Sequence, residues 1–445
     1  MSNLTPVIKS IQDIMRQDSG VDGDAQRISQ LTWLLFLKVF DALEEELELT
    51  RDHYQSPIPE AMRWRHWAAN PEGMTGEALL DFVDNQLFST LKSLSADPVR
   101  NPRGYVVRGV FEDAYNYMKS GHLLRQVVNK LNAIDFNRQA ERHQFNDLYE
   151  KILKDLQSAG NAGEFYTPRA VTQFMVDMVN PQLGEVVLDP ATGTGGFLVC
   201  AIEHLRKQVH NESQEAVLQN SIRGVEKKQM PHMLCVTNLL LHGIEVPSNI
   251  RHDNTLVRPL RDYTQADRVD VVLTNPPFGG VEEPGIEQGY PADVRTKETA
   301  DLFLVLIKHI LKTNGRAALV LPDGTLFGEG VKSRIKEQLL QECNLHTIVR
   351  LPNGRVIVVD AKAPVDAFLN ALQASGEEDR KKAFAGYVAA VRAHMNGLGS
   401  KAYWDQFEES PELVVMYLPG ETFFSAAIEN DPGLIEDGSL RKVIL

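Results

Sequence analysis

Val269-Asp270-Val271-Val272-Leu273-Thr274-Asn275-Pro276-Pro277-Phe278 is an apolar run that ends in two prolines and an aromatic ring. The apolar residues predict a buried strand over 269–274. Prolines fix their own φ angle and lack N–H groups, so they favour a preorganised loop. The stretch therefore predicts a strand that presents polar acceptors and one flat ring at the edge of a sheet.

This turn suits the exocyclic amine of a flipped-out base. Such an amine, like N6 of adenine, is a poor nucleophile because its lone pair is delocalised into the ring. The side-chain oxygen of Asn275 and the carbonyl of Pro276 could hold the nitrogen toward sp3 geometry, and Phe278 could stack on the base. An ordinary proline-rich turn with a core Phe explains these residues equally well, so other parts of the chain must discriminate.

From about residue 163, short apolar strands alternate with helices, which is typical of a doubly wound parallel α/β sheet. We expect strands at 186–188, 222–225, 269–274, 317–321 and 347–351. Ligands of such sheets bind at the carboxyl ends of the strands, where the motifs of this chain also fall.

The first 150 or so residues are predicted to be helical. Apolar residues recur at helical spacing in two segments, 25–47 and 80–94. No catalytic constellation appears there, so we interpret this part as a helical interaction or scaffolding domain.

Composition sets further limits. The 445 residues allow two or three domains, and without a long apolar run or a signal peptide we expect a soluble cytoplasmic protein. Three widely spaced cysteines predict packing thiols, with neither a disulfide framework nor a zinc site. The formal charge of -14 is unfavourable for binding DNA alone, so a DNA substrate would require a partner that supplies much of the affinity.

A glycine-rich turn follows the first predicted strand. Residues 187–197 read Val-Leu-Asp-Pro-Ala-Thr-Gly-Thr-Gly-Gly-Phe, and glycines at 193, 195 and 196 allow a ligand to approach the backbone closely. The helix start beyond them favours a carboxylate or phosphate. The spacing is not GxGxxG, so a dinucleotide site fits poorly.

Three further segments belong to the same predicted edge. Glu226 ends the second strand, where a carboxylate could accept both hydroxyls of a ribose, Asp253 begins 253–256, and 163–169 precedes the first strand. Taken singly, solvated acids and a helix start explain them better. Their order and common edge favour one ligand site.

With these motifs in one order, the chain resembles the modification subunit of type I restriction-modification systems, an S-adenosylmethionine-dependent N6-adenine DNA methyltransferase. The likeness covers about residues 1–354 and implies a Rossmann-like methyltransferase sheet preceded by an α-helical N-terminal domain. It also rests on 16–20, 26–28, 33–38, 300–303, 321–324 and 350–354.

The resemblance implies roles for individual residues. Glu226 would bind the ribose of the cofactor and Asp253 would lie beside its adenine. The target base would be held by Asn275, Pro276, Pro277 and Phe278. The methionine end would be covered by Glu164, Phe165, Tyr166, Thr167, Pro168 and Arg169, and the pocket would be lined by Asp189, Thr194, Gly195 and Gly196. No metal is expected, because the methyl group is already activated on a sulfonium.

The resemblance also implies partners. Two such subunits act with a DNA-specificity subunit, and with a translocating endonuclease subunit when DNA is cut. Such an assembly agrees with the acidic charge of this chain.

The tail after residue 354 instead resembles the RmuC family of DNA-recombination proteins, through 355–364, 391–394, 414–421 and 441–445. We therefore predict a helical domain at 1–150, a truncated methyltransferase domain at 151–354 and an α/β, partly restriction-endonuclease-like fragment at 355–445. The resemblance implies that Asp360 and Lys362 fit half of a nuclease motif, but Leu345 and His346 stand where its other half, a Pro-Asp pair, is expected. A structural role for Asp360 and Lys362 is favoured.

Other functions stay open. The Asn-Pro-Pro-aromatic turn could serve methylation of a protein glutamine or an RNA base. The fusion could instead be catalytically impaired and act in DNA recombination or binding through its tail, or it could fold poorly because of exposed sheet edges.

Overall fold

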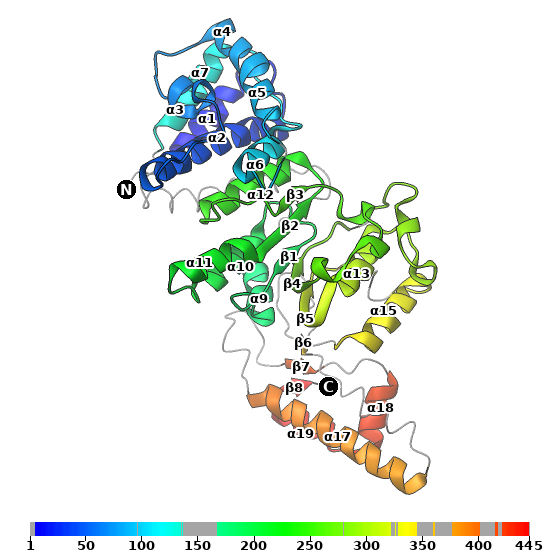
Figure 1. Cartoon of the computed structure of the whole chain (residues 1–445). Coiled ribbons are helices and arrows are strands. Elements are labelled where there is room, and N and C mark those ends of the chain that lie inside the picture. The colour runs from blue at the N-terminus through cyan, green and yellow to red at the C-terminus, as the bar shows by residue number, and fades with distance from the viewer. Residues whose placement is uncertain are drawn as a thin grey trace. The chain divides into compact units, whose positions relative to one another are not determined.

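The computed structural model of the chain describes residues 5–95, 97–134, 136, 167–278, 280–321, 325, 328–344, 359–360, 376–400, 414–416 and 421–444 (Figure 1). The chain separates into two compact units, Met1–Ile335 and Lys336–Leu445. In the described part of the chain, no helix is both long and apolar enough to cross a membrane.

The first unit begins with a helical layer, as the sequence predicts. Its largest helix, α2 (Asp24–Thr50), buries Trp33, Phe36 and Phe40. The run predicted at 80–94 forms α4 (Gly76–Asp81), the π-helical segment η2 (Phe82–Leu87) and α5 (Phe88–Lys92). The other elements of this layer are α1 (Thr5–Met15), η1 (Glu60–Met62), α3 (Trp64–Trp67), α6 (Pro102–Phe111) and α7 (Gly121–Asn132).

Two helices of this layer start at side-chain caps. The Asn101 side chain accepts a hydrogen bond from Gly104 N at 2.9 Å, and Pro102 occupies the first turn of α6. The Ser120 hydroxyl accepts from Leu123 N at 3.3 Å at the start of α7. These caps satisfy N–H groups that have no partner inside a helix.

A five-stranded parallel sheet follows, in the order β3-β2-β1-β4-β5. The strands are β1 (Val187–Asp189), β2 (Ile222–Glu226), β3 (Ile250–His252), β4 (Val269–Thr274) and β5 (Leu311–Leu319). Val187 pairs with Ile222 on one side and with Val271 on the other, so β1 is central. The order reverses between β1 and β4, which makes the carboxyl ends of these two strands the switch point of a doubly wound sheet.

The predicted strands agree with this sheet in part. The prediction for β4 is confirmed, and the predictions for β1 and β2 are correct to within one residue at each end. Strand β3 was not predicted, and β5 begins at Leu311 where the sequence suggested 317. The strand expected at 347–351 lies outside the described residues.

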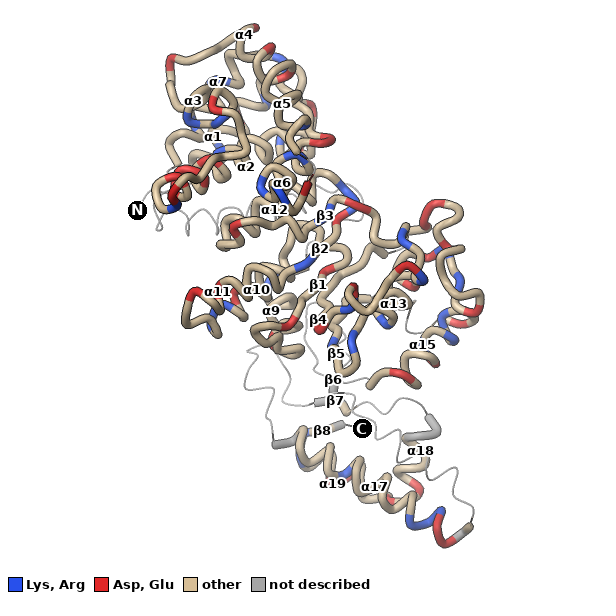
Figure 2. Tube along the Cα trace, viewed as in Figure 1, with Lys and Arg blue, Asp and Glu red and all other residues tan. Residues whose placement is uncertain are grey.

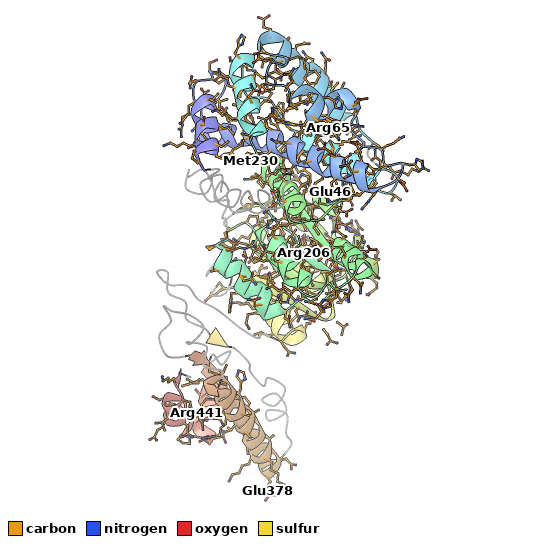
Figure 3. The ribbon with its side chains drawn as sticks, turned by 90° about the vertical axis from the view of Figure 1, so that its left-hand side faces the viewer. Glu46, Arg65, Arg206, Met230, Glu378 and Arg441 are labelled. Atoms are coloured by element: carbon orange, nitrogen blue, oxygen red, sulfur yellow. The ribbon has the colours of Figure 1, made fainter. Side chains whose placement is uncertain are left out.

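Helices cover the sheet (Figure 1). They are α9 (Arg169–Val179), α10 (Gly196–Arg206), α11 (Glu212–Ser221), α12 (Gln229–Leu241) and α13 (Thr299–Ile310), and α15 (Val331–Glu342) follows along the chain. Helix α12 contacts β2 and β3 on one side and α2 and α6 on the other. Figure 3 shows Met230, near the start of α12, where this helix meets the N-terminal helices.

A buried arginine joins the helical layer to the sheet. Arg103 donates to Glu44 Oε1 at 2.5 Å and to the Glu245 carbonyl at 2.6 Å, and its guanidinium lies over the Phe40 ring. Both charged side chains are almost fully buried, with relative exposures of 9% for Arg103 and 1% for Glu44. This pair fixes α2 and α6 against the loop that leads into β3.

The second unit has an α/β fold and its own core. It contains a parallel sheet ordered β6-β7-β8, made of β6 (Val359–Asp360), β7 (Val414–Met416) and β8 (Val443–Ile444). Its helices are α17 (Glu377–Ser400), α18 (Glu421–Asn430) and α19 (Leu434–Leu440). Tyr387, Met395 and Met416 are fully buried there. Asp360 ends β6, whereas Lys362, Leu345 and His346 lie outside the described residues.

Cysteines and surface charges complete the description. Cys200 and Cys235 are buried, as expected for packing thiols, but Cys343 is exposed, so that expectation was wrong for one of the three. Figure 2 shows acidic and basic residues mixed along the described trace of the first unit. This mixture agrees with the need for a partner in DNA binding.

Candidate active site

The sheet brings four predicted site residues to one edge. Asp189 ends β1 and Glu226 ends β2, while Asp253 follows β3 and Asn275 follows β4. Because all these strands are parallel, their carboxyl ends meet at the same edge. Four segments that are distant in sequence therefore reach one edge of the sheet, and Asp189 and Asn275 lie where the strand order reverses.

The glycine turn after β1 depends on backbone conformations that favour glycine. Gly193 and Gly195 have φ angles of +52° and +85°. A Cβ on Gly195 would lie 2.9 Å from the Cys235 sulfur, whereas one on Gly193 would meet nothing within 4 Å. Helix α10 begins at Gly196, and the Thr194 carbonyl accepts a hydrogen bond from the Asn238 side chain at 3.1 Å. The turn therefore packs against α12 at Gly195, whereas no atom of the described residues blocks the approach of a ligand at the Cα of Gly193.

The Glu226 carboxylate holds the glycine turn to the end of β2. Its Oε2 accepts from Gly193 N at 2.8 Å and its Oε1 accepts from Lys228 N at 2.9 Å. Both carboxylate oxygens of Glu226 therefore accept from backbone amides, which orients the glycine turn at the end of β2.

Asp189 is fully buried beneath the turn. Its Oδ1 accepts from Ala191 N at 3.0 Å. Its Oδ2, like the neighbouring Thr274 hydroxyl, makes no well-directed hydrogen bond to any described residue. Burial raises the pKa of Asp189 to about 7. Hydrogen bonding by the Thr274 hydroxyl and the Ala191 amide favours the charged form and lowers the pKa, but this effect is smaller than that of burial. The negative charge of Glu226 adds to the rise in the Asp189 pKa.

The Asn275 side chain is oriented by Thr167. Asn275 Nδ2 donates to Thr167 Oγ1 at 3.0 Å, and Thr167 belongs to the segment that the sequence assigned to the cofactor. Asn275 Oδ1 is buried and has no hydrogen-bond partner among the described residues. Buried acceptors are rarely left unsatisfied, so this oxygen is a candidate acceptor for a donor group of a ligand.

The rest of the proline loop varies in exposure. Pro276 is buried, Pro277 is exposed and Phe278 is half-buried. The loop therefore offers part of an aromatic ring at the edge next to Asn275.

Other predicted site residues occupy different positions. Glu164, Phe165 and Tyr166 lie outside the described residues. Pro168 is exposed at the start of α9, and the Arg169 guanidinium donates to Glu203 Oε2 on α10 at 2.6 Å. The charge of Arg169 thus contributes to helix packing.

Asp253 reaches the edge mainly through its backbone. Its N–H donates to the Glu226 carbonyl at 3.0 Å, while its side chain is exposed. Asp253 Oδ1 accepts from Asn254 N at 2.8 Å. The ends of β2 and β3 are therefore linked beside the glycine turn.

Sequence reasoning did not identify Glu282. Its carboxylate accepts from the Asn254 side chain at 3.1 Å and lies 3.3 Å from the Lys227 ammonium. Glu282 lies in a loop without periodicity, so no pattern in the sequence distinguishes it from the adjacent Glu283.

A pocket of about 190 Å³ lies between α6, α12 and β3. Its lining includes Arg108, His232 and His252, but none of the predicted site residues. The two imidazoles stack with ring centroids 5.2 Å apart, and burial lowers the pKa of His232 to about 4. A neutral, packed histidine supports a structural role for His232.

Comparisons with known proteins agree with the features of the first unit. Residues 140–371 match the family N-6 DNA Methylase, and residues 4–131 match the HsdM N-terminal domain. The methylase subunit of the type I restriction enzyme EcoEI from Escherichia coli is 65% identical over 353 residues, which cover 79% of this chain and 72% of that protein.

A solved structure shares the fold. A chain from a structural study of the assembly and conformational transition of the type I R-M system is 36% identical, with a TM-score of 0.69. The match covers 79% of this chain and 72% of that chain.

The tail matches a different family. Residues 318–445 match the RmuC family, which overlaps the methylase match over 318–371. A DNA recombination protein RmuC homolog from Zymomonas mobilis is 43% identical over 98 residues, which cover 22% of each protein. The overlap contains the junction that the sequence predicts at 350–354.

Proposed function

The chain belongs to the methylase subunits of type I restriction enzymes, with an RmuC-family region at its C-terminus, and we propose that the edge formed by β1, β2 and β4 is its active site. The chain is an adenine-specific DNA methyltransferase subunit that methylates N6. Its partners are DNA, a specificity subunit with a second methylase subunit, and the endonuclease subunit of the full complex. Because the substrate is DNA, we also propose a cytoplasmic location.

The methyl donor in this proposal is S-adenosylmethionine. It would supply a methyl group already activated by the positive charge of its sulfonium. The residues at the edge fit such a ligand, since the carboxylates of Asp189 and Glu226 are both buried beside the glycine turn and are acceptors for the hydroxyl and amino groups of the ligand. We assign Glu226 to the ribose hydroxyls and Asp253 to the side of the adenine. Thr194, Gly195 and Gly196 would line the pocket.

The observation that carries the proposal is the unpaired Oδ1 of Asn275. Thr167 fixes the amide so that this oxygen remains free, and the adjacent Pro276 carbonyl supplies a second acceptor. Two acceptors can each take one hydrogen of the adenine amino group and thereby localise its lone pair on nitrogen. Phe278 can stack on the flipped base. Positioning of this kind accounts for large rate enhancements without a general base.

The competing functions are less favoured. The relatives are DNA methylase subunits, which disfavours a protein glutamine or an RNA base as substrate. The same match disfavours a protein that acts only through its RmuC-like tail. The assignment of Asp360 and Lys362 to structural roles stays a prediction.

We also propose the domain limits suggested by the sequence. They are a helical domain at 1–150, a methyltransferase domain at 151–354 and an RmuC-like fragment at 355–445. The family matches at 4–131, 140–371 and 318–445 support this division.

Transfer of a labelled methyl group tests the proposal. The full chain would be assembled with a specificity subunit and incubated with DNA and labelled S-adenosylmethionine, and the DNA would then be digested to nucleosides. We expect label in N6-methyladenine, and much less of it in the same time with Asn275→Ala. Label that appears in protein or RNA, and never in DNA, would contradict the proposal.

A further inference from the structure

A loop leaves the sheet after the Asn275 turn and returns at the start of α13. Thr299 N donates to the Gly280 carbonyl at 3.1 Å, and Glu282 N donates to the Lys297 carbonyl at 3.0 Å. Val281 and Glu298 also form an antiparallel bridge. The two ends of this loop are therefore joined by hydrogen bonds, shortly after residues 275–278 in the sequence.

The Glu282 carboxylate extends from this loop to the other side of the site. Its Oε2 accepts from Asn254 Nδ2 at 3.1 Å and lies 3.3 Å from Lys227 Nζ. Its Oε1 accepts from Thr299 Oγ1 at 3.5 Å. The Glu282 side chain is only 10% exposed, whereas that of Glu283 is 75% exposed. The low exposure of Glu282 reduces the screening of its contact with Asn254, whereas the Lys227 side chain is 49% exposed and its ion pair with Glu282 is partly screened by solvent.

The partners of Glu282 adjoin the residues assigned to the cofactor. Lys227 directly follows Glu226, and Asn254 directly follows Asp253. Asn254 also caps η3 (Thr255–Val257), because its Oδ1 accepts from Leu256 N. One carboxylate thus connects the ends of β2 and β3 with the chain that continues from the Asn275 turn.

We propose that Glu282 is a positioning residue that couples the cofactor side of the site to the target-base loop. It acts through Lys227 and Asn254 and touches neither ligand. Hydrogen bonds to a carboxylate are roughly twice as strong as neutral ones, so the carboxylate holds both sides in one arrangement. Binding of cofactor would then favour the loop geometry that accepts the base. This inference rests on the proposed function.

The test compares Glu282→Ala, Glu282→Gln and the matched control Glu283→Gln in the full chain. Calorimetry with S-adenosylmethionine should show about tenfold weaker binding for Glu282→Ala, because charge-assisted bonds are lost. Glu282→Gln keeps an acceptor for Asn254 and should recover part of the affinity. Glu283 Oε1 lies 3.6 Å from the same Lys227 Nζ, but the Glu283 side chain is 75% exposed. Glu283→Gln should therefore bind nearly like the wild type, because an exposed ion pair contributes little, and it separates the exposed contact to Lys227 from the buried one.

A second measurement separates coupling from a merely structural effect. In the complex with a specificity subunit, the affinity for DNA is measured with and without S-adenosylhomocysteine. The ratio of the two affinities should move toward one in Glu282→Ala, because coupling between two ligands is reciprocal.

The outcomes distinguish the two proposals. An unchanged ratio and unchanged cofactor affinity in both Glu282 variants, with a wild type that binds, would overturn this inference alone. A folded wild-type chain that binds no S-adenosylmethionine would overturn the proposed function and this inference with it. If Glu282→Ala does not fold, the Gln variant gives the answer, because it preserves the size of the side chain.

Discussion

Replacement of Asp189 by Asn should make the pH dependence of cofactor binding shallower. Burial raises the pKa of Asp189 to about 7, so in the free protein this carboxyl group is largely neutral below pH 7. S-adenosylmethionine is cationic at its sulfonium, so the charged carboxylate should bind it better. The affinity should therefore rise as the pH increases through 7 and level off above 8.

The size of this effect follows from the pKa. At pH 6 about one tenth of the Asp189 side chains carry a charge, so binding should be about tenfold weaker than at pH 8. Calorimetry at half-unit steps from pH 5.5 to 8.5 measures this slope directly. The α-amino group of the ligand titrates in the same range, but its contribution appears equally in wild type and variant.

Two comparisons decide whether the reasoning is right. Asp189→Asn should show a shallower profile that meets the wild type near pH 6 and falls below it at pH 8. Asp177→Asn, which removes an exposed carboxylate on α9, should follow the wild type throughout. Equal slopes for wild type and Asp189→Asn would refute the assignment of this titration to Asp189.

Two further predictions concern stability. Arg103→Met should destabilise the first unit by about 3 to 5 kcal/mol, because Glu44 is left buried without its partner, whereas Arg51→Met, at an exposed pair, should cost at most about 1 kcal/mol. The loss of stability in each variant would be measured by denaturant unfolding, with hydrogen exchange of α2 and α12 as the probe. Equal losses of stability in Arg103→Met and Arg51→Met would contradict this explanation. Gly195→Ala should lower the thermal midpoint and weaken cofactor binding, because its Cβ would lie 2.9 Å from a cysteine sulfur on α12. Gly184 also has a positive φ, but a Cβ there would meet no other atom of the described residues, so Gly184→Ala should lower the thermal midpoint without weakening cofactor binding. An equal loss of cofactor affinity in the two variants would contradict the packing argument.

The strands that the sequence revealed are those with a strong local pattern. Val269–Thr274 has five buried residues out of six, so its apolar run marks β4 clearly. Strand β3 has one buried residue, Ile250, and it forms because Gly224 and the following residues of β2 offer a pairing edge. Pairing of this kind is a tertiary effect that no local window of sequence contains.

The site was predictable in its residue types but not in its contacts. Glycine, acid and Asn-Pro-Pro motifs indicated which strand ends carry ligands, and the topology brings them together. The bond from Glu226 to Gly193 spans 33 residues, and the bond from Asn275 to Thr167 spans 108 residues. Glu282 shows the same limit, since its importance comes from the contacts it makes across the site and not from its neighbours in sequence.

The rate of methyl transfer by Asn275→Ala tests the central claim most directly. In the full complex with saturating cofactor and DNA, a single-turnover experiment isolates the chemical step from binding. We predict that the variant binds S-adenosylmethionine with wild-type affinity but forms N6-methyladenine at least about a hundredfold more slowly, because one preorganised polar contact to the reacting group is lost. Methylation at the wild-type rate by this variant would show that the Asn275 oxygen does not hold the target amine.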